Sequence, residues 1–101
     1  MILPVKTRYI LELSEQDFTE GCRESYDDNP VCRCMKRMGM VAPYADKFTG
    51  GVSWTRLGER YNAIMPKEIC WMLKEYDADS KIAPQSFTVE SMVNLEIPEE
   101  N

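Results

Sequence analysis

Histidine is absent from this chain of 101 residues. Its absence removes the commonest general base, the commonest neutral metal ligand and every catalytic pairing of histidine with serine or cysteine. The carboxylates, among them Asp17, Asp77 and Asp79, are not organised by a phosphate-binding loop, a zinc-protease motif or a calcium-binding loop. The sequence therefore predicts a protein that is not an enzyme and that has no catalytic residues and no cofactor.

Long apolar runs are also missing. No stretch approaches the roughly 18 uninterrupted apolar residues of a membrane-spanning helix, and residues 1–5 lack the basic start and apolar run of a signal peptide. Hydrophobic residues make up 44% and charged residues 29%, which is typical of soluble globular proteins. We expect one domain over residues 1–97, a flexible acidic tail over residues 98–101, a cytoplasmic location and no membrane partner.

The four cysteines lack the spacing of a zinc site. Cys22, Cys32, Cys34 and Cys70 follow the pattern C-x9-C-x-C-x35-C, whereas zinc ligands usually come in close C-x-x-C pairs. Cys32 and Cys34 project from different sides of a predicted helix, and a reducing compartment keeps thiols free. We expect no metal and no disulfide, with Cys22 accessible, Cys34 buried, and Cys32 and Cys70 intermediate.

Positive charge is concentrated in the middle of the chain. The net charge is −5, which does not favour general binding of nucleic acids. Residues 29–67 nevertheless carry 7 basic and 2 acidic side chains, while the segments on both sides are acidic. These charges either pair across the fold or lie in solvent.

The first third of the chain contains one strand and two helices. Residues 5–13 alternate with a period of two, which predicts a half-buried strand. Ser14 is a good N-cap for a short helix that Gly21 ends, and residues 22–28 form a loop. Asn29-Pro30 then begins an amphipathic helix that Gly39 ends. Its predicted apolar stripe consists of Val31, Cys34, Met35 and Met38.

The rest of the chain contains a hairpin, a helix and a strand. After a loop through Gly50-Gly51, residues 52–56 and 60–65 form a hairpin. Pro66 begins the next helix, and residues 86–90 alternate again. The apolar stripe of this helix comprises Ile69, Met72, Leu73 and Tyr76. This order predicts an α+β protein with a ferredoxin-like split βαβ fold (βαββαβ), in which two helices cover one face of a four-stranded antiparallel sheet.

The alternation places polar side chains on the open face of that sheet and aromatic side chains on the other. RNA recognition motifs of the same topology display aromatic rings on the open face, so this pattern does not favour binding of RNA in that mode. The residues predicted to be on the open face are Lys6, Arg8, Ser53, Thr55, Arg60, Asn62, Ser86 and Thr88, and the inward aromatic residues are Tyr9, Trp54, Tyr61 and Phe87.

Two groups of residues are candidates for binding. Arg33, Lys36 and Arg37 share one side of the helix that begins at Pro30, where they either grip a partner or lie in solvent. Trp71 falls outside the apolar stripe of its helix, which places it at the margin of the core or on the surface as an aromatic anchor. These four residues are the predicted contacts to a protein partner.

An alternative is sequestration of a phosphorylated signal such as a cyclic nucleotide. Arginine side chains and an aromatic platform on the hairpin would bind it, with Arg56 or Arg60 near Trp54 or Tyr61. A chain of this size has little room for a deep pocket, so this site would form in a homo-oligomer, between copies of the chain.

Three stretches resemble a group of short bacteriophage-encoded accessory proteins. They are residues 11–18 followed by Gly21, residues 29–37, and Asp77 followed by residues 82–89. The group begins the central helix with Cys-Pro, where this chain has Asn29-Pro30. The resemblance implies a non-enzymatic protein in the host cytoplasm that binds and inhibits a host protein, in host takeover or in counter-defence. It supplies no activity that transfers residue by residue.

Overall fold

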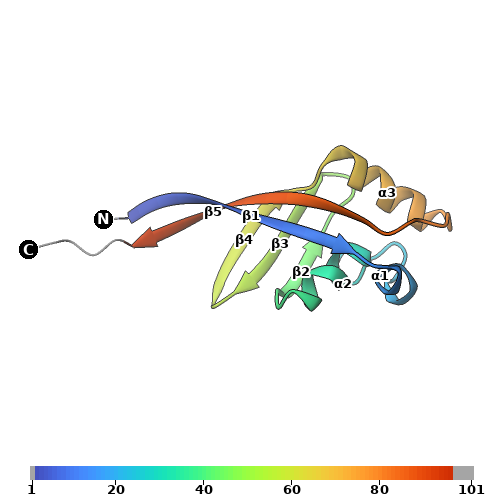
Figure 1. Ribbon diagram of the computed structural model, residues 1–101, viewed down its shortest axis with the longest axis horizontal. Coiled ribbons are helices and arrows are strands. Elements are labelled where there is room, and N and C mark those ends of the chain that lie inside the picture. The colour runs from blue at the N-terminus through green and yellow to red at the C-terminus, as the bar shows by residue number, and fades with distance from the viewer. Residues whose placement is uncertain (1, 97–101) are drawn as a thin grey trace, which may run out of the picture.

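The computed structural model describes residues 2–96 as an α+β fold (Figure 1), which confirms the predicted class. The predicted tail over residues 98–101 lies outside the described residues. In chain order, the elements are β1 (Ile2–Leu13), α1 (Glu15–Glu20), α2 (Pro30–Arg37), β2 (Val41–Ala45), β3 (Gly51–Arg56), β4 (Glu59–Ile64), α3 (Lys67–Asp77) and β5 (Gln85–Glu96).

The strands form two sheets, so the prediction of a single four-stranded sheet is wrong. β1 and β5 pair antiparallel over their whole length, from Ile2 opposite Glu96 to Leu13 opposite Gln85. β2, β3 and β4 form a separate antiparallel sheet in that order. β5 lies beside β4 without ladder hydrogen bonds, and the predicted ferredoxin-like arrangement is not confirmed.

β2 is the strand that sequence patterns did not predict. Pro43 lies inside it, and prolines are typical of turns and strand edges. The register of β2 against β3 shifts between Val41 and Tyr44, where Ala42 has a positive φ of 48°. A short, irregular edge strand of this kind has no clean period of two, so the alternation that indicates a strand is absent from its sequence.

The core lies between the helices and the inner faces of the two sheets. Trp54 is completely buried, and the ring of Tyr9 meets it edge-on with the centroids 5.2 Å apart. The predicted stripe of α3 is buried in full. On α2 the prediction fails only at Met38, which is 39% exposed, because the helix ends at Arg37 and Gly39 turns the chain with a φ of 85°. Met40 enters the core instead.

Asn29 ties α2 to its surroundings. Its Oδ1 accepts a hydrogen bond from the Cys32 amide at 3.0 Å, as an N-cap residue does. Its Nδ2 donates to the carbonyl oxygens of Ser25 at 2.9 Å and Ala45 at 3.1 Å. One buried amide therefore fixes the start of the helix, the preceding loop and β2 relative to one another.

The alternation of β1 gives a direct test of this core. Leu11 is 1% exposed and Ile10 is 62% exposed, although they are neighbours on one strand. We expect Leu11→Ala to lower the free energy of unfolding by about 2–5 kcal/mol, because it leaves a cavity. Ile10→Ala should stay within about 0.5 kcal/mol of the parent chain. Urea unfolding followed by tryptophan fluorescence measures both, and equal losses would contradict the assignment of faces.

Candidate functional site

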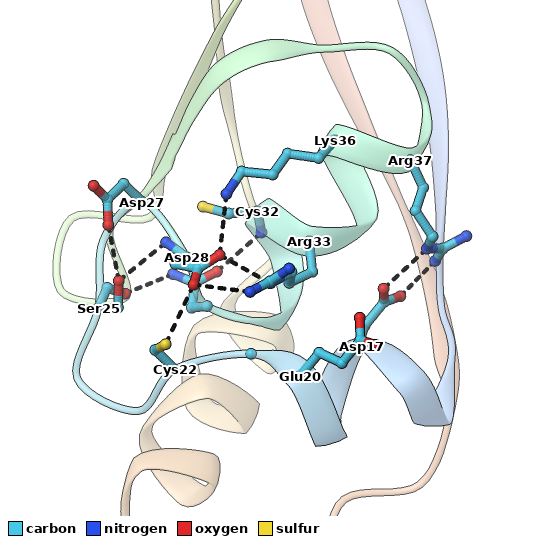
Figure 2. A network of polar contacts seen from close by, with 12 residues as sticks. Asp17, Glu20, Cys22, Ser25, Asp27, Asp28, Cys32, Arg33, Lys36 and Arg37 are labelled. Atoms are coloured by element: carbon cyan, nitrogen blue, oxygen red, sulfur yellow. Dashed lines mark hydrogen bonds and ion pairs between the residues drawn. The ribbon is translucent and has the colours of Figure 1, made fainter.

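The basic side of α2 is occupied by carboxylates of the protein itself (Figure 2). Lys36 Nζ lies 3.0 Å from Asp28 Oδ1, and Arg33 Nη2 donates to Asp28 Oδ2 at 3.1 Å. Arg33 Nε lies 2.9 Å from Asp28 Oδ1, but its N–H bond does not point at that oxygen, so the contact is an ion pair without a hydrogen bond. Although burial acts to raise the pKa of Asp28, hydrogen bonds from Lys36 and Cys22 hold it below its usual value.

Arg37 pairs with a different carboxylate on the same side of the molecule. Its Nε donates to Asp17 Oδ1 at 2.9 Å, its Nη2 bonds Asp17 Oδ2, and Nη2 also donates to the Glu12 carbonyl at 2.9 Å. Asp17 is 2% exposed and closes a capping box with Ser14 at the start of α1. Burial acts to raise the pKa of Asp17, but the hydrogen bonds from Arg37 and Ser14 outweigh it and lower the pKa.

The three basic residues predicted to grip a partner therefore have internal partners. Arg33 and Lys36 share Asp28, and Arg37 neutralises Asp17 (Figure 2). A surface composed of such pairs offers an external acidic group little net charge. The structure assigns these residues contacts that hold α1, α2 and the intervening loop together.

Trp71 lies on the surface, and its neighbours are not Arg33, Lys36 or Arg37 but a different set of side chains. Its side chain is 63% exposed, and Phe48 and Ile64 beside it are 68% and 69% exposed. Lys74 Nζ lies 5.7 Å from the Phe48 ring centroid and 5.8 Å from that of Trp71, within the range of cation–π attraction. We call this surface the aromatic–lysine patch, and it comprises Phe48, Ile64, Lys67, Trp71 and Lys74 around an open hollow of about 400 Å³.

The turn before β3 holds Phe48 in this patch. Asp46 Oδ1 accepts a hydrogen bond from the Phe48 amide at 2.8 Å, and the Gly50 amide donates to the Asp46 carbonyl at 2.8 Å. Gly50 has a φ of 81°, which favours glycine. Lys47, which lies 5.0 Å from the Phe48 ring centroid, pairs with Asp77 at the end of α3. These contacts hold the backbone of the turn that carries the exposed ring.

Sequence patterns found Trp71 but not the other residues of the patch. Phe48 lies in a predicted loop, where an aromatic residue has no period to follow. Lys67 and Lys74 resemble any solvated helix residue until the fold places them around Trp71. The one available signal is Phe48 itself. It is a large apolar side chain between the polar residues Lys47 and Thr49, and it belongs to no apolar stripe that would place it in the core.

The four hairpin residues predicted to bind a phosphorylated ligand are not gathered in one pocket. Trp54 is completely buried and is therefore not a platform for a base or sugar. Arg60 lies on the opposite face from Tyr61 and donates to Ala42 O, Thr55 Oγ1 and Ser53 Oγ. Arg56 is exposed at the end of β3. Strand alternation turns Arg60 and Trp54 to opposite faces of the sheet, whereas Arg56 follows Trp54 by two residues on β3 and shares its face.

The thiols are free in the structure, and no cluster of three or more potential metal-ligating side chains occurs among the side chains that the structure describes. Cys22 is exposed and Cys34 is buried, as predicted. Cys32 is completely buried, so its predicted intermediate exposure is wrong, because the side of α2 that carries it faces the loop and β2. Burial raises the pKa of Cys32 to about 12 and that of Cys34 to about 11.

Comparisons with family models, curated proteins and solved structures yield no match for this chain. In the described part of the chain, no helix combines the length and the apolar character needed to cross a bilayer.

The burial of the cysteines predicts their order of modification. We expect a maleimide reagent to label Cys22 first and the half-buried Cys70 next in the folded protein. Cys32 and Cys34 should react only when urea unfolds the chain. Mass spectrometry of timed samples identifies the sites, and early labelling of Cys32 would contradict the packing of α2.

The pair of Asp17 and Arg37 predicts a pH-dependent stability. Because the pKa of Asp17 is lowered on folding, its ionised form stabilises the fold above its unfolded pKa of about 3.9, and this contribution is lost as the pH falls through the folded value. We expect Asp17→Asn to cost about 1.5–3 kcal/mol at neutral pH. The difference from the parent chain should shrink as the pH falls below about 4.

Urea unfolding at a series of pH values measures this effect. Arg37→Gln and the double variant complete a thermodynamic cycle, in which the double variant should cost less than the sum of the two single variants. Additive losses, or a difference that does not depend on pH, would show that the two side chains are not coupled.

Proposed function

We propose that this chain is a non-enzymatic binding protein that inhibits a bacterial host protein by covering part of its surface with the aromatic–lysine patch. The observation that carries the proposal is the exposure of Trp71 and Phe48 side by side on a fixed turn and helix. Aromatic side chains contribute much of the energy of protein interfaces, and large apolar side chains gathered on a surface are a mark of such sites.

The chemistry of the patch favours a partner with acidic and apolar side chains. Lys67 and Lys74 have no carboxylate within 4.0 Å in the part of the chain that the structure describes. They place positive charge on a protein whose net charge is −5. An acidic surface is attracted to this patch and repelled by the acidic remainder of the molecule, which fixes the orientation of binding.

The backbone that carries the patch is also held by internal contacts. Phe48 is held by the Asp46 turn and by the pairing of Lys47 with Asp77, and Trp71 projects from the middle of an 11-residue helix. A preformed surface loses less conformational entropy on association than a mobile loop. The resemblance to short bacteriophage proteins supports a host protein as the target, in host takeover or counter-defence.

Affinity capture from a bacterial lysate tests this proposal. Tagged protein should retain one host protein in a stoichiometric complex, and Trp71→Ala should weaken the complex by about 30-fold or more. Lys67→Glu with Lys74→Glu should slow association and reduce its dependence on salt. The matched control is Arg56→Glu, a charge reversal at an exposed residue outside the patch, which should leave the affinity unchanged.

Two results would contradict the proposal. The first is the absence of any stoichiometric host partner. The second is a complex that survives Trp71→Ala but is lost in Arg33→Glu with Lys36→Glu in a chain that remains folded by circular dichroism. Calorimetry against cyclic nucleotides examines the sequestration alternative, and tight binding that requires Arg56 or Arg60 would favour that function instead.

A further inference from the structure

The open hollow in the aromatic–lysine patch has an apolar floor. Its least exposed apolar side chains are Met65, which is buried, and Cys70, which is half-buried. Gly50 leaves the space above them open, because a β-carbon at Gly50 would lie 3.5 Å from Cys70 Sγ and 3.7 Å from Ile64 Cγ2. With a volume of about 400 Å³, the hollow is large enough to receive a bulky apolar side chain.

Two exposed aromatic rings border this hollow from different elements. Phe48 comes from the turn before β3 and Trp71 from α3, and their side chains are 68% and 63% exposed. Lys74 Nζ lies 5.7 Å and 5.8 Å from the two ring centroids, so both rings border the same cation. An apolar side chain that enters the hollow would remove ring surface from water, which favours binding.

The charged residues around the hollow are all lysines. Lys47, Lys67 and Lys74 line it, and no acidic side chain is among its lining residues in the described part of the chain. The sequence as a whole has 17 acidic and 12 basic residues, so this local excess of positive charge is unusual for the molecule. Lys47 pairs with Asp77, whereas the other two lysines remain available to carboxylates of a partner.

We propose that the hollow receives one bulky apolar side chain from a short acidic segment of the host protein, and that carboxylates beside this side chain pair with Lys67 and Lys74. The inference rests on the proposed function, because it names the part of the partner that meets the patch. An apolar group in a pocket within a polar rim is the usual arrangement of a binding hot spot. Two copies of this chain that met through the patch would bring like charges together.

Cys70 provides a measurement confined to the hollow. Its thiol lies at the floor, whereas Cys22 is exposed in the loop before α2 and does not line the hollow. A molecule that fills the hollow should therefore slow the labelling of Cys70 by a maleimide and leave the labelling of Cys22 unchanged. Mass spectrometry of timed samples measures both rates in one experiment.

The probe is a capped heptapeptide of the sequence Asp-Glu-Asp-Phe-Asp-Glu-Asp. At about 5 mM and low salt it should slow the labelling of Cys70 by about sixfold, which corresponds to a Kd of about 1 mM. Two control peptides separate the contributions of shape and charge. One has alanine in place of phenylalanine, the other has lysine in place of every acidic residue, and neither should protect Cys70.

Three variants localise the effect, with each rate expressed relative to the same variant without peptide. Lys67→Glu with Lys74→Glu should abolish the protection, because it reverses the charge beside the hollow. Trp71→Ala should weaken the protection, because it removes one of the two rings. Arg56→Glu is the matched control at an exposed residue outside the patch, and it should leave the protection unchanged.

Four results would overturn the inference. Equal protection by the alanine peptide would show that no apolar side chain enters the hollow, and protection by the lysine peptide would show that carboxylates are not selected. The absence of protection by the probe would show that the hollow does not accept such a segment. Labelling of Cys70 that slows as the protein concentration rises, without peptide, would show that a second copy covers the hollow.

Failure of this inference can be distinguished from failure of the proposed function. A captured host protein that depends on Trp71 but leaves the labelling rate of Cys70 unchanged would retain the proposed function and overturn the inserted side chain. The absence of any stoichiometric host partner would instead contradict the proposed function, whatever the peptides do.

Discussion

The buried carboxylate of Asp17 is the interaction on which the arrangement of the helices depends. It caps α1 through Ser14, binds Arg37 at the end of α2, and brings Arg37 to the Glu12 carbonyl at the end of β1. Three elements meet at one charged pair, and a carboxylate that is 2% exposed requires such partners. Asp28 does the same for Arg33 and Lys36 on the loop side of α2.

This use of charge determines where the protein can bind others. The richest cluster of basic side chains, on α2, serves the fold, because all three of its cations pair with the carboxylates of Asp17 and Asp28. The lysines around Trp71 lie on α3, away from Asp17 and Asp28, and retain their charge for an external group. A protein with an overall charge of −5 thus places two lysines beside two exposed aromatic rings.

Local patterns predicted most of the elements correctly because their causes are local. The N-caps Ser14 and Asn29, the stripe of α3 and the alternation of β1 follow from the geometry of a single helix or strand. The edge strand β2 and the division into two sheets were missed. Pairing of strands depends on residues far apart in sequence, and β5 can lie beside β4 without bonding to it.

The sequence by itself determined the α+β class and the inward position of Trp54. It also determined that the chain has four cysteine thiols and no histidine side chain. Only the tertiary structure decided which charges are consumed by the fold and which remain available, because an ion pair such as Arg37 with Asp17 joins residues 20 positions apart. It also decided that Phe48 and Ile64 join Trp71 on one surface. Such gatherings arise from chain packing, and no periodicity along a single segment encodes them.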